Sequence, residues 1–493
     1  MVLSKNNNLR REIYRLELEI EKQEAALATN RSLLRKFKAN LARENPTFPV
    51  LTLPPEITSE IFVYCVSEDI EPADYNDPPF VLLRVCKAWN RIAMTTPALW
   101  TKIHLKLETS QMPKLMLTLR TMAKRSGQVC LSVKIAGRGY RTHRLGMNAF
   151  WSLFGEMSNR IQYLQIDMTS KQLKQLAAVS PAFPSLEHLG MTSLATESLH
   201  IFNNTPLLRS LNLSDDLDIS RVQLPLGAIT RLRASDFSTN RLRLTLQALP
   251  NLRFFRGKQA HSRTQETLAS VNESVVHPSL CKVYLEEASD LDYMTLPNVE
   301  VLEFDCWEYN LNPKFLDRAL ARANPPLRRM AFWPDTWSGV LILDSLDFLM
   351  RTPKLAELEL NYPSVGTLNM FCHDFRGREA FLPRIEKLVF RCQSPPREKE
   401  GNDYEDAKEA RLETFVQDVL NATKDRVVGT PQHPARQVPS FELRIILTAE
   451  ENDEQVGLVA WSDAQVAQCQ EIESRGVKLW IGPESRNLVA MYL

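Results

Sequence analysis

One apolar pattern recurs along most of this 493-residue sequence and restricts the folds that the chain can adopt. Hydrophobic residues stand at the first, fourth and sixth places of ten successive segments, whose first residues lie 19 to 30 residues apart. The clear copies are Ile161/Leu164/Ile166, Leu186/Leu189/Met191, Leu208/Leu211/Leu213, Leu280/Val283/Leu285, Val299/Leu302/Phe304, Leu327/Met330/Phe332, Leu355/Leu358/Leu360 and Ile385/Leu388/Phe390, and weaker copies start at Ile229 and Leu252. A period of this length is typical of repeat arrays, in which each unit buries its apolar side against its neighbours.

Proline supports the same register independently. It stands two places before the first anchor in eight of the ten units, far more often than 29 prolines scattered over the chain would place it. These prolines are Pro184, Pro206, Pro250, Pro278, Pro297, Pro325, Pro353 and Pro383. Because proline stops a helix and holds the preceding residue extended, each unit is predicted to run from a helix through a proline into a strand.

The period and the unit order predict an α/β fold, a leucine-rich-repeat solenoid shaped as a horseshoe with one parallel sheet, over residues 101–448. A charged insertion is predicted near residues 393–412. Residues 449–493 are predicted to cap the array, with a helix from Asp463 to Arg475 and a last strand at 477–481; another strand is predicted just before the cap, at 441–447. Asp463 is the expected N-cap and Gly476 the expected C-cap of that helix.

Near the N-terminus, the apolar residues follow one heptad register, with Gln23 and Asn30 at its two remaining seam positions. They are Leu9, Ile13, Leu16, Ile20, Leu27, Leu34, Phe37 and Leu41. This register predicts a helix within residues 1–45 that ends near Glu44 and carries a coiled-coil seam, through which two copies could form a homodimer. The alternative is an amphipathic helix that docks on its own chain or stays alone.

Residues 51–105 are predicted to form a compact helical block. Leu53-Pro54-Pro55-Glu56 begins a helix, because proline in the first turn costs no hydrogen bond. A second helix is predicted from the apolar stripe between Leu82 and Ala93, and a strand from Leu99, where the apolar residues begin to alternate. An acidic, proline-rich segment separates the two helices.

Three strings in this block, LPPEI at 53–57, VCKAW at 85–89 and TPALW at 96–100, resemble the F-box, in the form that mushroom-forming fungi combine with degenerate leucine-rich repeats. The acidic insert at residues 69–79 departs from that pattern. The resemblance implies an F-box at residues 46–100 that binds a Skp-type adaptor and, through it, a cullin ligase. The implied adaptor-binding residues are Leu53, Pro54, Ile57, Ile61, Leu83, Val85, Cys86 and Trp89. For Trp89, packing in the helical core is the alternative.

The resemblance therefore implies a non-catalytic substrate-recognition subunit of a cullin-type (SCF) ubiquitin ligase, whose repeats bind a protein substrate. One alternative is a repeat-based scaffold that recruits no ligase. Another is a hydrolase whose catalytic triad is assembled only in the folded array, since triads are spatial rather than sequential.

Side chains alternate along a strand, so the residue between the last two anchors of each unit is predicted to point to the concave face of the sheet. Along the units these residues change from basic to acidic, with aromatic residues between them. The predicted substrate-binding residues are Arg233, Arg256, Tyr284, Glu303, Trp333 and Glu359. The alternative is a solvated face whose charges bind nothing.

Composition argues against other classes of protein. Lys and Arg (60) nearly balance Asp and Glu (59), which leaves no broad basic surface for nucleic acid. Glycine is scarce at 16 residues, the eight cysteines form no CxxC pair, and no Walker, GxSxG or HExxH motif occurs, so no cofactor and no metal are expected. Without an apolar leader or an eighteen-residue apolar run, we expect no membrane association and a cytoplasmic or nuclear location.

Overall fold

The computed structural model describes part of the chain in detail. The described residues are 15–16, 19–20, 22–37, 53–67, 70, 76–107, 112–137, 147–192, 200–214, 218–237, 239–259, 274–306, 312–334, 341–393, 402–429, 440–448, 462–484 and 487–489. The chain divides into two units. The first comprises Met1–Trp100 with Arg125–Gly127, and the second comprises Thr101–Lys124 with Gln128–Leu493.

The first unit is helical where it is described. Residues 22–37 form part of a helix, and they are followed by α2 (Pro55–Tyr64), α3 (Leu82–Val85), α4 (Lys87–Thr95) and the 3₁₀ turn η2 (Pro97–Trp100). Pro54 is the N-cap of α2 and Pro55 its first helical residue, as the sequence predicts. The end of the N-terminal helix predicted near Glu44 lies outside the described residues.

Two predictions for this unit are wrong in detail. The single helix expected between Leu82 and Ala93 is broken at Cys86, whose backbone is extended (φ −159°) and whose Sγ accepts a hydrogen bond from the Trp89 N–H at 3.5 Å. Cysteine therefore caps α4, a role that residue preferences do not suggest. The strand expected from Leu99 begins only at Lys102, because Leu99 belongs to η2.

A small aromatic core holds the α2–α4 block together. Phe62 and Trp100 are buried, and the Phe62 and Trp89 rings lie 4.9 Å apart. The Trp100 Nε1–H donates a hydrogen bond to the Ala93 carbonyl at 2.9 Å, and the Arg125 guanidinium lies 4.3 Å above the Trp100 ring. The block thus has its own packed interior despite its small size.

The second unit is built on one parallel sheet that has 14 strands in the described residues, ordered β1-β2-β3-β4-β5-β6-β7-β9-β11-β12-β13-β14-β15-β16. The strands are β1 (Lys102–Lys106), β2 (Leu131–Ala136), β3 (Ile161–Asp167), β4 (His188–Met191), β5 (Ser210–Ser214), β6 (Arg231–Phe237), β7 (Phe254–Gln259), β9 (Lys282–Leu285), β11 (Val301–Cys306), β12 (Arg329–Pro334), β13 (Glu357–Asn361), β14 (Lys387–Gln393), β15 (Glu442–Thr448) and β16 (Lys478–Gly482). A separate pair, β8 (Val275–Val276) and β10 (Met294–Thr295), was not predicted. The predicted α/β solenoid is confirmed.

The strands align in the register that the repeats predict. The fourth-place anchors lie opposite one another from Leu164 through Leu189 to Leu388, and the sixth-place anchors align in the same way. These side chains are buried, apart from the missing side chain at Gly257 in the weak seventh-strand copy. Each unit therefore contributes the same places to one continuous core.

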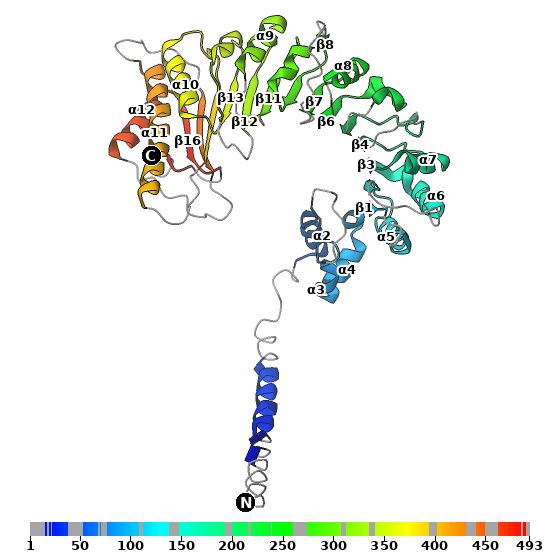
Figure 1. Cartoon of the computed structure of the whole chain (residues 1–493). Helices are drawn as coiled ribbons and strands as arrows, with labels where there is room; N and C mark the ends of the chain where they lie inside the picture. Colours follow the sequence, from blue (N-terminus) through cyan, green and yellow to red (C-terminus); the bar gives the residue numbers. More distant parts are fainter. Residues whose placement is uncertain are drawn as a thin grey trace, which may run out of the picture. The chain divides into compact units, whose positions relative to one another are not determined.

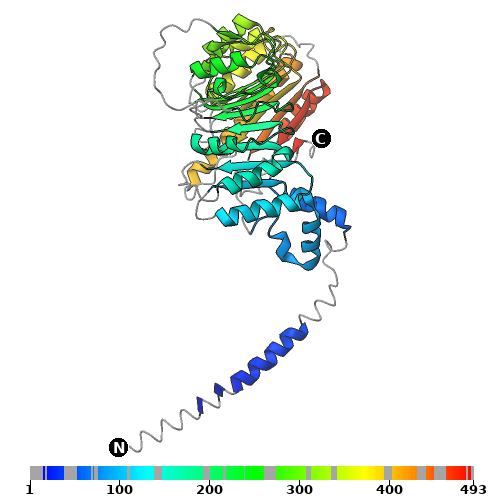
Figure 2. The same cartoon turned by 90° about the vertical axis from the view of Figure 1, so that its right-hand side faces the viewer.

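Helices cover the outer side of the curved sheet, and its strands line the inner side (Figure 1). In the turned view, the strands of the first part of this unit, drawn in cyan and green, are stacked one above another (Figure 2). The connecting helices are α5 (Met112–Arg125), α6 (Met147–Met157), α7 (Ser170–Ala178), α8 (Thr239–Ala248), α9 (Pro313–Ala323), α10 (Val365–Gly377), α11 (Asn402–Val427) and α12 (Asp463–Ser474). The inner face is therefore left to the strand side chains.

The C-terminal elements continue this pattern. The strands predicted at 441–447 and 477–481 are confirmed as β15 and β16, and both extend the same sheet. From residue 402 onward, the charged insertion forms the start of α11. The N-cap of α12 is Ser462, which forms a capping box with Gln465, so the prediction of Asp463 is wrong by one residue.

Side chains just before the first anchors connect neighbouring repeats. Asn251 Nδ2 donates to the Gly227 carbonyl and Asn298 Nδ2 to the Pro278 carbonyl, both at 2.8 Å. Ser185 Oγ donates to the Asn159 carbonyl at 2.7 Å. These bonds satisfy turn carbonyls at the end of the units where the strands begin.

A buried arginine fastens the two helices that cover the C-terminal repeats. Arg426 of α11 is 2% exposed, and its guanidinium donates hydrogen bonds to the carbonyls of Phe375, Phe381 and Leu382 at 2.8 to 3.0 Å. It also lies 4.1 Å from the centre of the Phe375 ring. One side chain thus joins α11 to the end of α10 and the turn that follows it.

Candidate interaction surfaces

An exposed apolar stripe runs along α2. Leu53 (38% exposed), Ile57 (49%), Ile61 (40%) and Tyr64 (87%) follow one another at helical spacing, and we call them the α2 stripe. The opposite side of α2 carries the buried Thr58 and Phe62. Since the helix already buries one side, the α2 stripe is surface that the folded block leaves open to a partner.

The other predicted adaptor-binding residues differ in exposure. Pro54 is exposed beside Leu53, and Val85 at the end of α3 is 54% exposed. Leu83, Cys86 and Trp89 are half-buried, the last two engaged in the α4 cap and the Phe62 contact. The structure thus gives Cys86 and Trp89 a packing role and leaves Pro54 and Val85 accessible.

The predicted substrate-binding residues lie on consecutive strands of the sheet. Arg233, Arg256, Tyr284 and Glu303 are opposite one another in register, and Glu359 occupies the same place on β13. Trp333 lies on β12, two places beyond Ala331 of the same row. The row is uneven in exposure: Arg233 and Arg256 are exposed, Tyr284, Glu303 and Trp333 are half-buried, and Glu359 is only 5% exposed.

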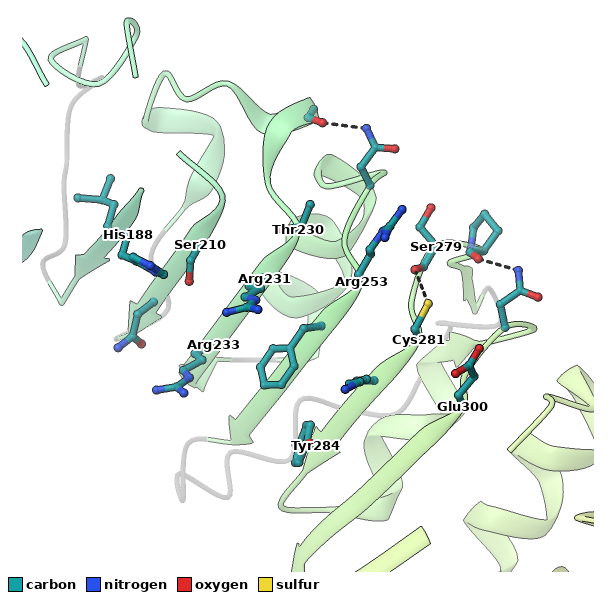
Figure 3. Close-up of a pocket in the computed structure, with 18 of the residues that line it drawn as sticks. His188, Ser210, Thr230, Arg231, Arg233, Arg253, Ser279, Cys281, Tyr284 and Glu300 are labelled. Carbon is teal, nitrogen blue, oxygen red and sulfur yellow. Dashed lines mark hydrogen bonds between the residues drawn. The ribbon is translucent and has the colours of Figure 1, made fainter. Parts of the chain in front are cut away.

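A groove of about 1460 Å³ crosses the inner face between β3 and β11 (Figure 3). Four basic side chains line it, from Arg231, Arg233, Arg253 and Lys282, with one carboxylate at Glu300. Tyr163, His188, Phe254 and Tyr284 supply its aromatic walls, and the Phe254 and Tyr284 rings lie 5.1 Å apart. We call this feature the basic groove.

The cations of the basic groove have no partner in the described part of the chain. No ion pair or hydrogen bond there engages the side chains of Arg231, Arg233, Arg253 or Lys282, and all four are exposed. The charges of Arg231 and Arg233 act on the neighbouring His188. Burial lowers the pKa of His188, the two arginines lower it further, and Glu187 raises it. The groove thus carries a net positive field.

Farther along the same face, one arginine gathers three carboxylates. Arg329 of β12 contacts Glu303 (2.9 Å), Glu357 (2.7 Å) and Glu359 (3.0 Å), each on a neighbouring strand, and we call this group the Arg329 clamp. Burial disfavours the charged guanidinium, but the hydrogen bonds that Arg329 donates to Glu357 and Glu303 outweigh this cost and raise the Arg329 pKa above its usual value. All three carboxylates are therefore already paired with a cation of their own chain.

A second arginine extends the clamp. Arg391 of β14 contacts Glu359 at 3.0 Å and Glu484 at 2.6 Å, and its guanidinium lies 5.2 Å from the Trp333 ring. Glu303, Glu359 and Trp333, which the sequence offered as a ligand surface, are therefore in contact with arginines of their own chain. On this face, the cations of the basic groove remain available to a ligand, whereas the charged residues of the Arg329 clamp are paired within the chain.

Several residues of this face escaped prediction. Lys282 and Arg329 stand two places before Tyr284 and Ala331, so the same strand alternation places them on this face. His188 stands two places before Gly190 of the central row, so alternation places it on this face as well. Arg253 precedes its strand, so alternation gave no signal for it. Their place in the groove depends on the stacking of repeats.

The described residues contain no group of three or more His, Cys, Asp or Glu side chains placed to hold a metal ion. Within the same residues, no helix has the length and apolar character needed to cross a membrane.

Comparison with known proteins identifies one domain. A family model described as F-box-like matches residues 50–106, which include α2 to α4. No curated protein matches the chain. Among solved structures, the chain is similar to one in the crystal structure of the Rad7 and Elc1 complex in yeast, with 13% identity and a TM-score of 0.27, over 64% of this chain and 97% of that chain.

Proposed function

We propose that this protein is the substrate-recognition subunit of a cullin-type ubiquitin ligase. The F-box-like domain would bind a Skp-type adaptor, and the repeat solenoid would hold a protein substrate. The observation that carries this proposal is the F-box-like match at residues 50–106, together with the open α2 stripe on the first helix of that domain.

The structures of the two units are consistent with separate roles in adaptor binding and substrate binding. The α2–α4 block has its own core and leaves apolar side chains exposed, as a docking module does. The sheet of the second unit offers a long inner surface free of covering helices, which is the usual binding side of a solenoid. The protein would hold the substrate close to the ligase, and other subunits would catalyse the transfer of ubiquitin.

Reconstitution tests this proposal directly. The full chain, purified with a Skp-type adaptor, is expected to co-elute with it in size-exclusion chromatography. After addition of a cullin–RING module, E1, E2, ubiquitin and ATP, we expect adaptor-dependent ubiquitin transfer onto the chain itself. Failure to bind any Skp-type adaptor would instead favour a repeat-based scaffold that recruits no ligase.

We also propose that the N-terminal helix mediates homodimerisation. Ile20, Leu27, Leu34 and Phe37 are each at least half exposed, so the apolar seam has no cover within the described residues. Ile20→Glu with Leu27→Glu is expected to convert a dimer into a monomer in analytical ultracentrifugation, because two charges would enter the seam. Ala25→Glu with Ser32→Glu adds the same charge off the seam and should leave the dimer intact. A wild-type chain that sediments as a monomer at micromolar concentration would refute dimerisation.

A further inference from the structure

The basic groove and the Arg329 clamp lie on the same face of the same sheet. They differ in whether their charged side chains are paired with opposite charges. In the clamp, three carboxylates surround one guanidinium at 2.7 to 3.0 Å. In the groove, four exposed cations have no acidic partner among the described residues. Like charges gathered without counter-charges repel one another, which costs stability unless a ligand neutralises them.

We propose that the basic groove binds an extended acidic segment of the protein substrate. This inference rests on the proposed function, since it names the class of substrate that the solenoid would recognise. The ligand chemistry is a row of anionic oxygens, carboxylate or phosphate, presented by a peptide.

The geometry of the groove fits a peptide that runs across the strands. Arg231 and Arg233 project from β6, Arg253 precedes β7 and Lys282 begins β9, so basic groups come from three successive strands (Figure 3). Neighbouring strands are about 4.8 Å apart, so the seven strands from β3 to β11 span about 29 Å, the length of about nine extended residues. Such a segment could place several anionic side chains beside these cations.

The arginines and the aromatic walls suggest how the segment is held. Arginine binds carboxylate and phosphate through two parallel N–H donors, and such bonds are stronger than neutral ones. Phe254 lies in register between Arg231 and Lys282, and its ring is 5.1 Å from the Tyr284 ring, so the two rings offer apolar area for the side chains that separate the anions. A peptide that alternates acidic and apolar residues matches this arrangement.

Nucleic acid fits less well. A protein that reads a phosphate backbone usually neutralises six to ten phosphates, about twice the number of cations here. Glu300, which directly precedes β11, lines the groove at one end, and Glu303 and Asp305 lie on β11 itself. A long polyanion that continued along the sheet would therefore leave the positive field after a few phosphates.

Peptide arrays test the inference with the full chain and no adaptor. The probes are nine-residue peptides whose alternate positions hold Glu, phosphoserine, Gln or Lys, with varied residues between them, and a nine-nucleotide oligothymidylate serves as the competing class. We expect Glu or phosphoserine peptides to bind and Gln and Lys peptides to fail. A preference between the first two identifies carboxylate or phosphate as the natural group. Binding of the oligonucleotide alone, or equal binding of the Gln peptides, would overturn the inference.

Variants locate the binding site. Arg231→Gln with Arg233→Gln should weaken binding of the best peptide about tenfold or more, because the variant removes two charge-assisted donors from the groove. Lys171→Gln with Lys314→Gln removes the same charge from exposed residues of α7 and α9 and should change affinity little. Equal weakening by both pairs would show a long-range charge effect and contradict a site in the groove.

His188 gives a second, local readout. Its neighbours on the adjacent strands, Tyr163 and Ser210, carry no charge at neutral pH, so the charges that act on it are Glu187, Arg231 and Arg233. A bound anion would offset the two arginines, so the His188 pKa measured by NMR should rise when an acidic peptide binds. An unchanged pKa at saturation would place the peptide elsewhere.

These assays separate the inference from the proposed function. Peptide binding without the adaptor, combined with failure of adaptor binding in reconstitution, would retain the groove and refute the ligase. Adaptor-dependent ubiquitin transfer without acidic-peptide binding would do the reverse.

Discussion

Ile57→Glu with Ile61→Glu is expected to abolish binding of a Skp-type adaptor while both units stay folded. The two side chains are 49% and 40% exposed in the centre of the α2 stripe, so the variant removes apolar contact area without opening a core. Truncation of residues at the centre of an interface costs about 2 kcal/mol or more, a loss of about 30-fold, and two buried charges add to that cost. Glutamate also favours helix, which protects α2.

Titration calorimetry with purified adaptor measures this loss. The milder pair Leu53→Ala with Pro54→Ala should weaken binding in the same direction, since both side chains are exposed at the start of α2. Glu56→Gln changes an exposed residue of the same helix outside the stripe and serves as the control. Wild-type affinity in the double glutamate variant, with circular dichroism unchanged, would show that the adaptor binds another face.

The second large effect is expected at Arg426. Arg426→Met keeps the length of the side chain but leaves the carbonyls of Phe375, Phe381 and Leu382 without their buried donor. Each unsatisfied buried group costs about 1–3 kcal/mol, so the free energy of unfolding of the C-terminal repeats should fall by about 3 kcal/mol or more. Hydrogen exchange should show the loss first in α10 and α11.

Lys424→Met provides the matched control on the same helix. Lys424 forms an ion pair with Glu471 at 2.7 Å, but both side chains are about 40% exposed. Exposed pairs contribute about 0–1 kcal/mol, so this change should barely alter urea unfolding. Similar destabilisation by the two variants would mean that the buried hydrogen bonds of Arg426 contribute nothing specific.

Periodic features of the sequence were sufficient to predict the solenoid. Anchors such as Leu189 and Leu302 recur with prolines before them, and a side-chain place that repeats must occupy the same position in every stacked unit. The second strand, β2, lacked this signal: no proline stands two places before Leu131, and its pairing with β3 shifts register beside that residue.

Contacts between side chains of different repeats could not be predicted in the same way. Arg329 meets Glu303 and Glu359 from positions 26 and 30 residues away, and only the stacking of strands brings them together. The sequence shows that Arg329, Glu303, Glu357 and Glu359 share one face of the sheet. It does not show which of these residues form ion pairs. The cap formed by Cys86 is similar, because it depends on a local backbone conformation that residue preferences do not favour.

The Arg329 clamp also has a mechanical consequence. Its ion pairs bridge β11, β12 and β13 along the inner rim, and Arg391 carries the connection to β14, so flattening the curve there would pull opposite charges apart. The stretch from β6 to β9 is joined more weakly: its Arg256 forms an exposed ion pair with Asp305 of β11 at 3.5 Å, while Arg231, Arg233 and Lys282, unpaired among the described residues, repel one another. The curved sheet should therefore resist deformation more strongly at β11–β14 than at β6–β9. An increase in its radius of curvature would be easiest at β6–β9.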